Sequence, residues 1–98
     1  MPAVSRQGDA CTGHDSWVPR GSSGGSGDVY VNGIPCHREG DGWPEHESPT
    51  PDSEPHPGTT AGGSGTVYAN GQPVARIGDP VDCGSAIAAG SGDVFAGG

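Results

Sequence analysis

Three histidines and one cysteine occupy recurring positions in this sequence and could together bind a metal ion. His14 and His46 each follow a Gly-Asp pair by five residues, and Cys83 follows another Gly-Asp pair by four. His56 and Cys83 each precede a Gly-Ser-Gly triplet by seven residues. Three imidazole nitrogens and one thiolate sulfur make a closed tetrahedral site of the kind that zinc prefers, and a closed site has a structural role.

Other interpretations of the same residue types stay open at this level. Cys11 begins the stretch Cys-Thr-Gly-His and could replace the histidine of that stretch as a ligand. His46 and His56 stand among Pro, Ser and Glu residues, where an isolated histidine is usually a solvated loop residue. We interpret Cys36 and His37 as strand residues, because they fall on a predicted return strand.

The sequence lacks a catalytic metal motif. A catalytic zinc site keeps an open coordination position and usually has a general base, such as the glutamate of His-Glu-x-x-His. The stretch that begins at His46 has Thr50 where the second histidine should be. We therefore predict that the protein is not an enzyme, with a small zinc-dependent hydrolase as the alternative.

The composition offers little material for a hydrophobic core. Only 30% of the 98 residues are hydrophobic, and the chain contains 20 glycines and 10 prolines. Ordering such a chain costs on the order of 100 kcal/mol of conformational entropy. The sequence is therefore either a glycine-rich metal-binding linker or a domain held together by its metal, since structural zinc contributes roughly 10–16 kcal/mol to folding.

Charge and hydropathy exclude several classes of partner. The formal net charge is −8, with only four basic residues, so we expect no nucleic-acid surface. No apolar run approaches the length of about 18 residues that a membrane span needs, and no Sec-type signal pattern opens the chain. We expect no stable membrane anchor. The three cysteines are an odd number and widely spaced, which argues against a complete disulfide framework.

A repeated hairpin must position these ligands. Segments 25–41 and 63–79 align in register, each with Gly-Ser-Gly, Val-Tyr, Asn-Gly, Pro and Arg-x-Gly-Asp. An Asn-Gly pair between short β-rich runs predicts a hairpin with a type I′ turn, and we expect each Arg-x-Gly-Asp to form a structural ion pair. Segment 90–98 opens a third copy, and segment 1–9 has the features of its return strand. We predict neighbouring termini and a closed ring of three hairpins with pseudo-three-fold symmetry.

With these features the sequence resembles the PAAR-repeat proteins, which are named for a Pro-Ala-Ala-Arg motif. The motif reads Pro-Val-Ala-Arg at 73–76, Pro-Cys-His-Arg at 35–38 and Pro-Ala-Val-Ser-Arg at 2–6, followed each time by x-Gly-Asp. None of the three matches the motif to the letter. The resemblance covers nearly the whole chain and implies one all-β domain over residues 1–98, a small cone with little or no helix and with zinc near its apex.

The resemblance also implies a ligand set and a partner. Zinc would be held by three histidines and one cysteine, which matches His14, His46, His56 and Cys83. The partner would be a trimeric spike protein with a β-helical tip, from a type VI secretion system or a contractile phage tail, bound by one copy of this chain per trimer. The protein would be assembled in the bacterial cytoplasm and would then sit at the phage tail tip or be secreted with the spike.

The base of such a ring would meet the spike. A trimeric β-helix ends in three exposed strand edges, and three hairpins can cap all of them by strand addition and apolar contact. Register decides which side chains face the partner, and runs this short do not fix it. The residues that we expect to supply this base and the small core above it are Val29, Tyr30, Val31, Ile34, Val67, Tyr68, Val94 and Phe95.

Overall fold

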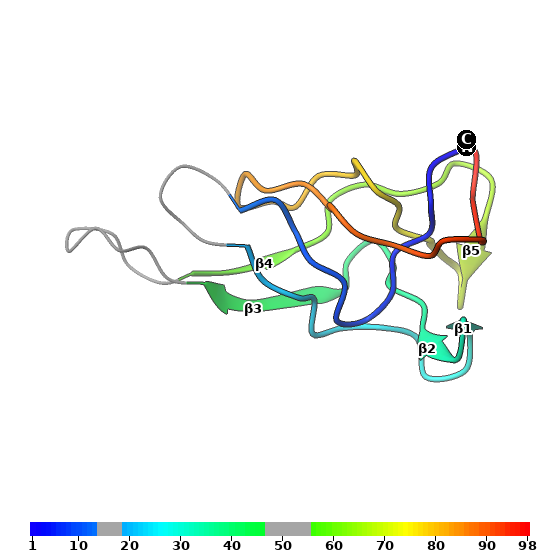
Figure 1. The fold of residues 1–98 in the computed structure, drawn as a ribbon, viewed down its shortest axis with the longest axis horizontal. Coiled ribbons are helices and arrows are strands. Elements are labelled where there is room, and N and C mark those ends of the chain that lie inside the picture. Colours follow the sequence, from blue (N-terminus) through cyan, green and yellow to red (C-terminus); the bar gives the residue numbers. More distant parts are fainter. Residues whose placement is uncertain (14–18, 47–55) are drawn as a thin grey trace.

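The computed structural model describes residues 1–13, 19–46 and 56–98, and these residues form an all-β fold (Figure 1). No helix long and apolar enough to cross a membrane occurs among them. Antiparallel pairing joins the strands as β1–β2, β3–β4 and β5–β6. In chain order the strands are β1 (Tyr30–Val31), β2 (Ile34–Pro35), β3 (Gly42–His46), β4 (His56–Thr59), β5 (Tyr68–Ala69) and β6 (Gln72–Pro73).

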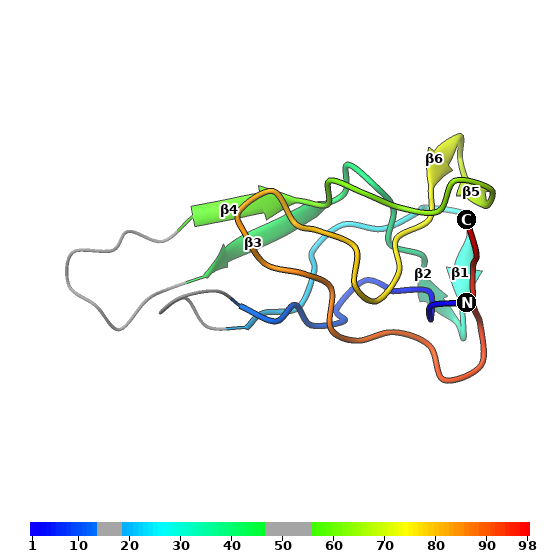
Figure 2. The same cartoon turned by 90° about the horizontal axis from the view of Figure 1, so that it is seen from above.

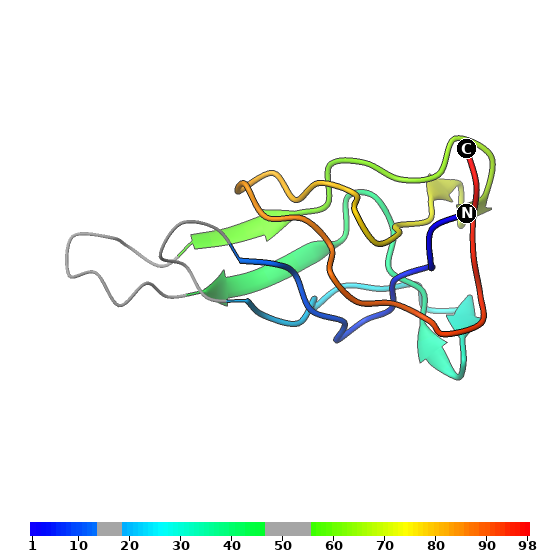
Figure 3. The same cartoon turned by 45° about the horizontal axis from the view of Figure 1, so that its top comes forward.

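The hairpins divide the molecule into two ends. Hairpins β1–β2 and β5–β6 lie together with both chain termini at one end, which we name the base (Figure 1, Figure 2). Hairpin β3–β4 runs toward the opposite end, where β3 stops at His46 and β4 begins at His56 (Figure 3). We name this end the apex.

The two Asn-Gly hairpins have the predicted geometry. Tyr30 lies opposite Pro35 in β1–β2, and Tyr68 lies opposite Pro73 in β5–β6. Both central residues of each turn have positive φ, which is 55° at Asn32 and 77° at the following glycine. Positive φ at both positions defines a type I′ turn, which matches the twist of the strands on either side. The predicted hairpins are confirmed.

The two ends of the chain build the third hairpin together. Ala3 forms an antiparallel bridge with Phe95. The Val4 amide donates to the Val94 carbonyl oxygen at 2.9 Å, and the Ala96 amide donates to the Pro2 carbonyl oxygen at 3.1 Å. The predicted closure of the ring between neighbouring termini is confirmed, and one motif position is corrected. Ala3, not Pro2, takes the place of the motif proline, because Ala3 is the residue that pairs with the aromatic position.

A cyclic set of hydrogen bonds joins the three return strands at the centre. The Ser5 amide donates to the Ala75 carbonyl oxygen at 2.9 Å, the Ala75 amide to that of His37 at 2.9 Å, and the His37 amide to that of Ser5 at 3.1 Å. All three residues have 0% exposure. Equivalent residues of three repeats thus satisfy one another's backbone groups around the pseudo-three-fold axis, where water cannot.

Each Arg-x-Gly-Asp turn is fixed by an ion pair, as predicted. A second guanidinium nitrogen reaches the other carboxylate oxygen in every copy, and the aspartate also accepts the backbone N–H of its arginine. These hydrogen bonds raise the pKa of each arginine against the opposing effect of burial. The shortest N–O distances are 2.8 Å for Arg6–Asp9, 2.9 Å for Arg38–Asp41 and 3.1 Å for Arg76–Asp79.

The turns at the base are tied to neighbouring repeats. The Asn32 side chain donates to Asp93 at 2.8 Å and accepts from the Ser91 hydroxyl at 2.6 Å, and the bond from Asn32 lowers the pKa of Asp93. Asn70 makes the same two contacts with the preceding repeat. The third repeat has Gly97 in place of the asparagine, and the Gly97 carbonyl oxygen accepts a serine hydroxyl in the same way.

Small apolar residues fill two layers between base and apex. The small size of most of them lets three strands approach one axis. Trp43 is the exception and has the largest side chain of either layer. The lower layer consists of Val4, Val31, Cys36, Ala69, Val74 and Ala96. The upper layer consists of Cys11, Trp43, Ala75, Val81 and Ile87, with Cys83 packed against it.

Candidate metal apex and spike-binding base

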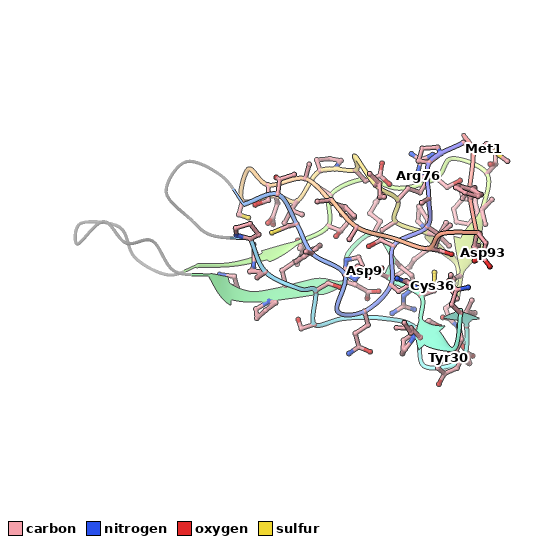
Figure 4. All side chains as sticks on the ribbon, viewed as in Figure 1. Met1, Asp9, Tyr30, Cys36, Arg76 and Asp93 are labelled. Carbon is pink, nitrogen blue, oxygen red and sulfur yellow. The ribbon has the colours of Figure 1, made fainter. Side chains whose placement is uncertain are left out.

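Six of the predicted partner-binding side chains are exposed at the hairpin ends. They come in three equivalent pairs, and each side chain is between 37% and 56% exposed. Figure 4 labels Tyr30 of one pair and Asp93, which precedes another pair, at the base end of the molecule. The pairs are Val29 and Tyr30, Val67 and Tyr68, and Val94 and Phe95.

The other two residues of the predicted set, Val31 and Ile34, are less exposed than these six. Val31 is only 7% exposed and belongs to the lower core layer, so within the predicted set it lies in the core above the base and not on the exposed surface. Period-2 alternation after the exposed Tyr30 turns Val31 inward. Ile34 is half-buried. Sequence reasoning missed Met1, which is 86% exposed beside Gly97 at the base.

The apex brings two of the predicted ligand positions face to face. Hairpin β3–β4 pairs Trp43 with Gly58 and, after an irregularity in register, pairs His46 with His56. Residues directly opposite in an antiparallel pair have Cβ atoms about 4.5–5.5 Å apart. The backbone thus puts these two positions within the spacing that one metal ion requires of its ligands.

Cys83 lies beside the same hairpin. Thr60, which follows β4, forms an antiparallel bridge with Val81. The Asp82 amide donates to the Thr59 carbonyl oxygen at 2.9 Å, and the Asp82 carboxylate accepts from the Thr59 amide and hydroxyl at 2.9 Å each. The chain around Cys83 therefore runs along β4.

The fourth predicted ligand, His14, lies outside the described residues, although the segment before it is placed. The Thr12 amide donates to the Ala86 carbonyl oxygen at 2.8 Å, and Cys11 forms a bridge with Ile87. This segment thus runs along the chain segment that follows Cys83. Among the side chains that the structure describes, no three His, Cys, Asp or Glu residues cluster as metal ligands, and Cys83 is the one predicted ligand among them.

Cys11 occupies a core position. It is 2% exposed in the upper layer and follows its Gly-Asp pair by the same two residues as Trp43 and Val81. Burial would raise the pKa of its thiol, but hydrogen bonds with Arg20, Gly13 and Ser85 and the charge of Arg20 together outweigh burial and lower it. No disulfide joins Cys11, Cys36 and Cys83, all of which lie among the described residues.

A buried polar chain beneath the apex was not predicted from the sequence. The Trp43 indole N–H donates to the Thr60 hydroxyl at 2.8 Å, and that hydroxyl lies 2.7 Å from His37 Nε2. His37 Nδ1 lies 2.7 Å from the Gly24 carbonyl oxygen, which can only accept, so Nδ1 carries the proton and Nε2 accepts from Thr60. Burial lowers the pKa of His37 and favours this neutral imidazole. The sequence feature that could have revealed this buried chain is His37, which stands where the Pro-Ala-Ala-Arg motif has its second alanine.

The arrangement defines a class of protein. Three pseudo-equivalent hairpins close into a ring with an exposed apolar base at one end, and at the other end β3–β4 pairs the backbone positions of His46 and His56. The class is a small ring-shaped β-domain with pseudo-three-fold symmetry and an exposed apolar end.

Comparison with known families agrees with this class. The PAAR motif family matches residues 8–89, which is most of the chain, and the protein belongs to this family. PAAR proteins are structural spike tips and not enzymes, so the hydrolase alternative is set aside. A search of curated proteins found no match to the chain.

Proposed function

We propose that this protein is the tip of a contractile injection machine and caps the trimeric β-helical end of its spike, one copy per trimer. The family associates the chain with the tips of type VI secretion spikes and phage tails. The whole span 1–98 would act as one domain, because Val4 and Ala96 pack in the same core layer. After assembly in the bacterial cytoplasm, the protein would travel with the spike or remain at the phage tail tip.

The exposed base carries this proposal. Three pairs of apolar side chains at equivalent positions are exposed on a chain with only 30% hydrophobic residues. Leaving such a patch in water is unfavourable, and large exposed apolar patches usually mark interaction sites. A partner with three equivalent strand ends would cover all three pairs at once.

We further propose that zinc stabilises the apex. The donor types, imidazole and thiolate, fit this metal. The placement supports it too, since His46 and His56 are paired across β3–β4 and Cys83 lies on the chain that runs beside β4. His14 would complete a tetrahedral set of three imidazoles and one thiolate. When bound, the ion would tie segments from three repeats together at the apex, beyond the upper core layer.

Binding to a trimeric spike fragment tests the base directly. The double substitution Tyr30→Asp with Tyr68→Asp places charge on two of the three pairs and should weaken binding at least about 100-fold, as expected for hot-spot aromatics. Ile77→Asp is the matched control, since Ile77 is 40% exposed but lies in the Arg76–Asp79 turn. Equal affinity of the base variant and the wild type would refute the proposal.

A further inference from the structure

One arginine connects the apical segments. Arg20 Nη1 lies 3.5 Å from Cys11 Sγ, and Arg20 Nη2 lies 3.7 Å from Cys83 Sγ. The Arg20 backbone amide also donates to Cys11 Sγ at 3.4 Å. The guanidinium thus stands between two sulfur atoms that come from opposite ends of the sequence.

The position of the guanidinium is fixed by other contacts. Its carbon lies 5.4 Å from the centroid of the Trp43 ring, within the range of a cation–π interaction. Its Nε donates to the Pro44 carbonyl oxygen in β3. One face therefore lies on an indole ring and three nitrogens have partners, so the donors approach the sulfur atoms from a defined direction.

The strand beside Arg20 leaves room for it. A Cβ atom added to Gly58 of β4 would lie 3.0 Å from Val81 Cγ1, 3.1 Å from Arg20 Nη2 and 3.1 Å from Asp82 Oδ1. This approach is closer than ordinary van der Waals contact, so a side chain at Gly58 would displace the guanidinium or the Cys83 segment. The absence of a side chain at this position of β4 thus leaves room both for Val81 of the upper core layer and for the guanidinium.

We propose that Arg20 is a positioning residue for the apical metal: its N–H group holds the Cys83 sulfur at the place from which the sulfur binds zinc. This inference rests on the proposed zinc site. A metal-bound thiolate keeps much of its negative charge, and an N–H donor to the sulfur stabilises that charge and orients the ligand. The planar fork of arginine can serve two sulfur atoms at fixed angles, which the single ammonium of lysine cannot.

Metal titration of the full chain tests this role. The apo-protein of the wild type, Arg20→Met and Arg20→Lys would be titrated with Co²⁺ and then with Zn²⁺ in competition with a chromophoric chelator. Loss of an outer-sphere partner typically weakens metal affinity 10- to 100-fold. We expect that loss for Arg20→Met, a smaller loss for Arg20→Lys, and a shifted sulfur-to-cobalt charge-transfer band in both. Gly58→Ala should act in the same direction.

Controls separate positioning from folding. Cys36→Val removes a buried thiol at a position where the other two repeats have Val4 and Val74, and it should leave the cobalt spectrum unchanged. Thermal melting of each apo-protein reports any general loss of stability. Arg20→Lys keeps the test decisive if Arg20→Met does not fold.

The outcomes distinguish the two proposals. If the wild type binds Co²⁺ with a thiolate band while the Arg20 variants bind equally well with the same band, only the role of Arg20 is overturned. The same holds if the loss of affinity is fully matched by a lower apo-protein melting temperature with no change in the band. If the wild type binds neither metal, the zinc proposal itself is wrong.

Discussion

The Val4 amide donates a hydrogen bond to the Val94 carbonyl oxygen at 2.9 Å, although the two residues lie near opposite ends of the chain. The same bond joins Cys36 to Val29 at 2.9 Å and Val74 to Val67 at 3.0 Å within the two continuous repeats. The chain thus completes its third hairpin with its own beginning. The chain therefore forms a closed ring, because each of the three opening strands pairs with a return strand.

This closure depends on a glycine where the two ends meet. A Cβ atom at Gly90 would lie 2.7 Å from the Val4 carbonyl oxygen, whereas a Cβ atom at Gly92 would meet nothing within 4 Å. Gly90→Ala should therefore lower the free energy of unfolding by about 1–3 kcal/mol, the usual cost of overpacking. Gly92→Ala is the control and should be nearly neutral. Urea unfolding of both variants measures the difference, and equal stabilities would contradict the closure.

The ion pairs of the Arg-x-Gly-Asp turns should contribute to stability because they are mostly shielded. The Arg38 and Asp41 side chains are 16% and 12% exposed, and the carboxylate also accepts the Arg38 amide. Asp41→Asn should cost about 1–3 kcal/mol, less than a fully buried pair. Glu39→Gln makes the same change of charge in the same turn and should cost under about 0.5 kcal/mol. A similar cost for both variants would mean that only net charge matters.

Much of the fold follows from local rules in the sequence. Asn32-Gly33 and Asn70-Gly71 require positive φ, which predicts both turns, and the Arg-x-Gly-Asp signature at Arg6 identifies the missing return strand. The sequence did not predict which side chains of a hairpin face the core and which face outward, because β1 has only two residues and Tyr30 and Val31 alone do not define an alternation. The misplaced motif proline has a similar cause, since register is decided by pairing across the ring.

The side-chain networks could not be predicted because they join residues that are distant in sequence. Ser91 and Asn32 meet across two repeats, and Arg20 lies between thiols at Cys11 and Cys83. No local spacing encodes such contacts. Among the proposed apical ligands, His46 matches His14 and His56 matches Cys83 in repeat spacing. The register of β3–β4 brings the positions of His46 and His56 opposite each other.

Stability should fall in mild acid because of His37. Burial lowers the pKa of this imidazole below its ordinary value of 6.5, and Arg38 opposes protonation while Asp41 and Asp9 favour it. The unfolded chain binds the proton more readily, so stability is complete above about pH 6.5 and is lost as the pH falls toward the lower folded-state pKa. The slope would approach about 1.4 kcal/mol per pH unit.

The acid dependence is measured by urea unfolding between about pH 7 and pH 4.5 with a chelator present, a range that spans the ordinary titration of histidine. His37→Gln keeps hydrogen-bonding groups at this position but cannot titrate there, so its slope should be smaller than that of the wild type. Both proteins carry the same other histidines, and the difference between their slopes therefore isolates His37. Parallel curves would contradict the assignment.

The proposed ligands should be separable from Cys11 by substitution. Cys83→Ala should abolish tight zinc binding and lower the melting temperature by at least about 10 °C, since each kcal/mol shifts a domain of this size by roughly 4–8 °C. Cys11→Val introduces the residue found at the equivalent position Val81 and should keep the metal. Zinc content by elemental analysis and melting with and without chelator provide the readouts. Loss of zinc in Cys11→Val with retention in Cys83→Ala would exchange the two roles.

The most direct test of the account is the mass of the complex with a trimeric β-helical spike fragment, measured by light scattering during size-exclusion chromatography. A pseudo-three-fold ring that caps one spike end must bind as a single chain per trimer, even when the tip protein is in excess. A complex with three copies per trimer would contradict the account, as would the absence of any complex.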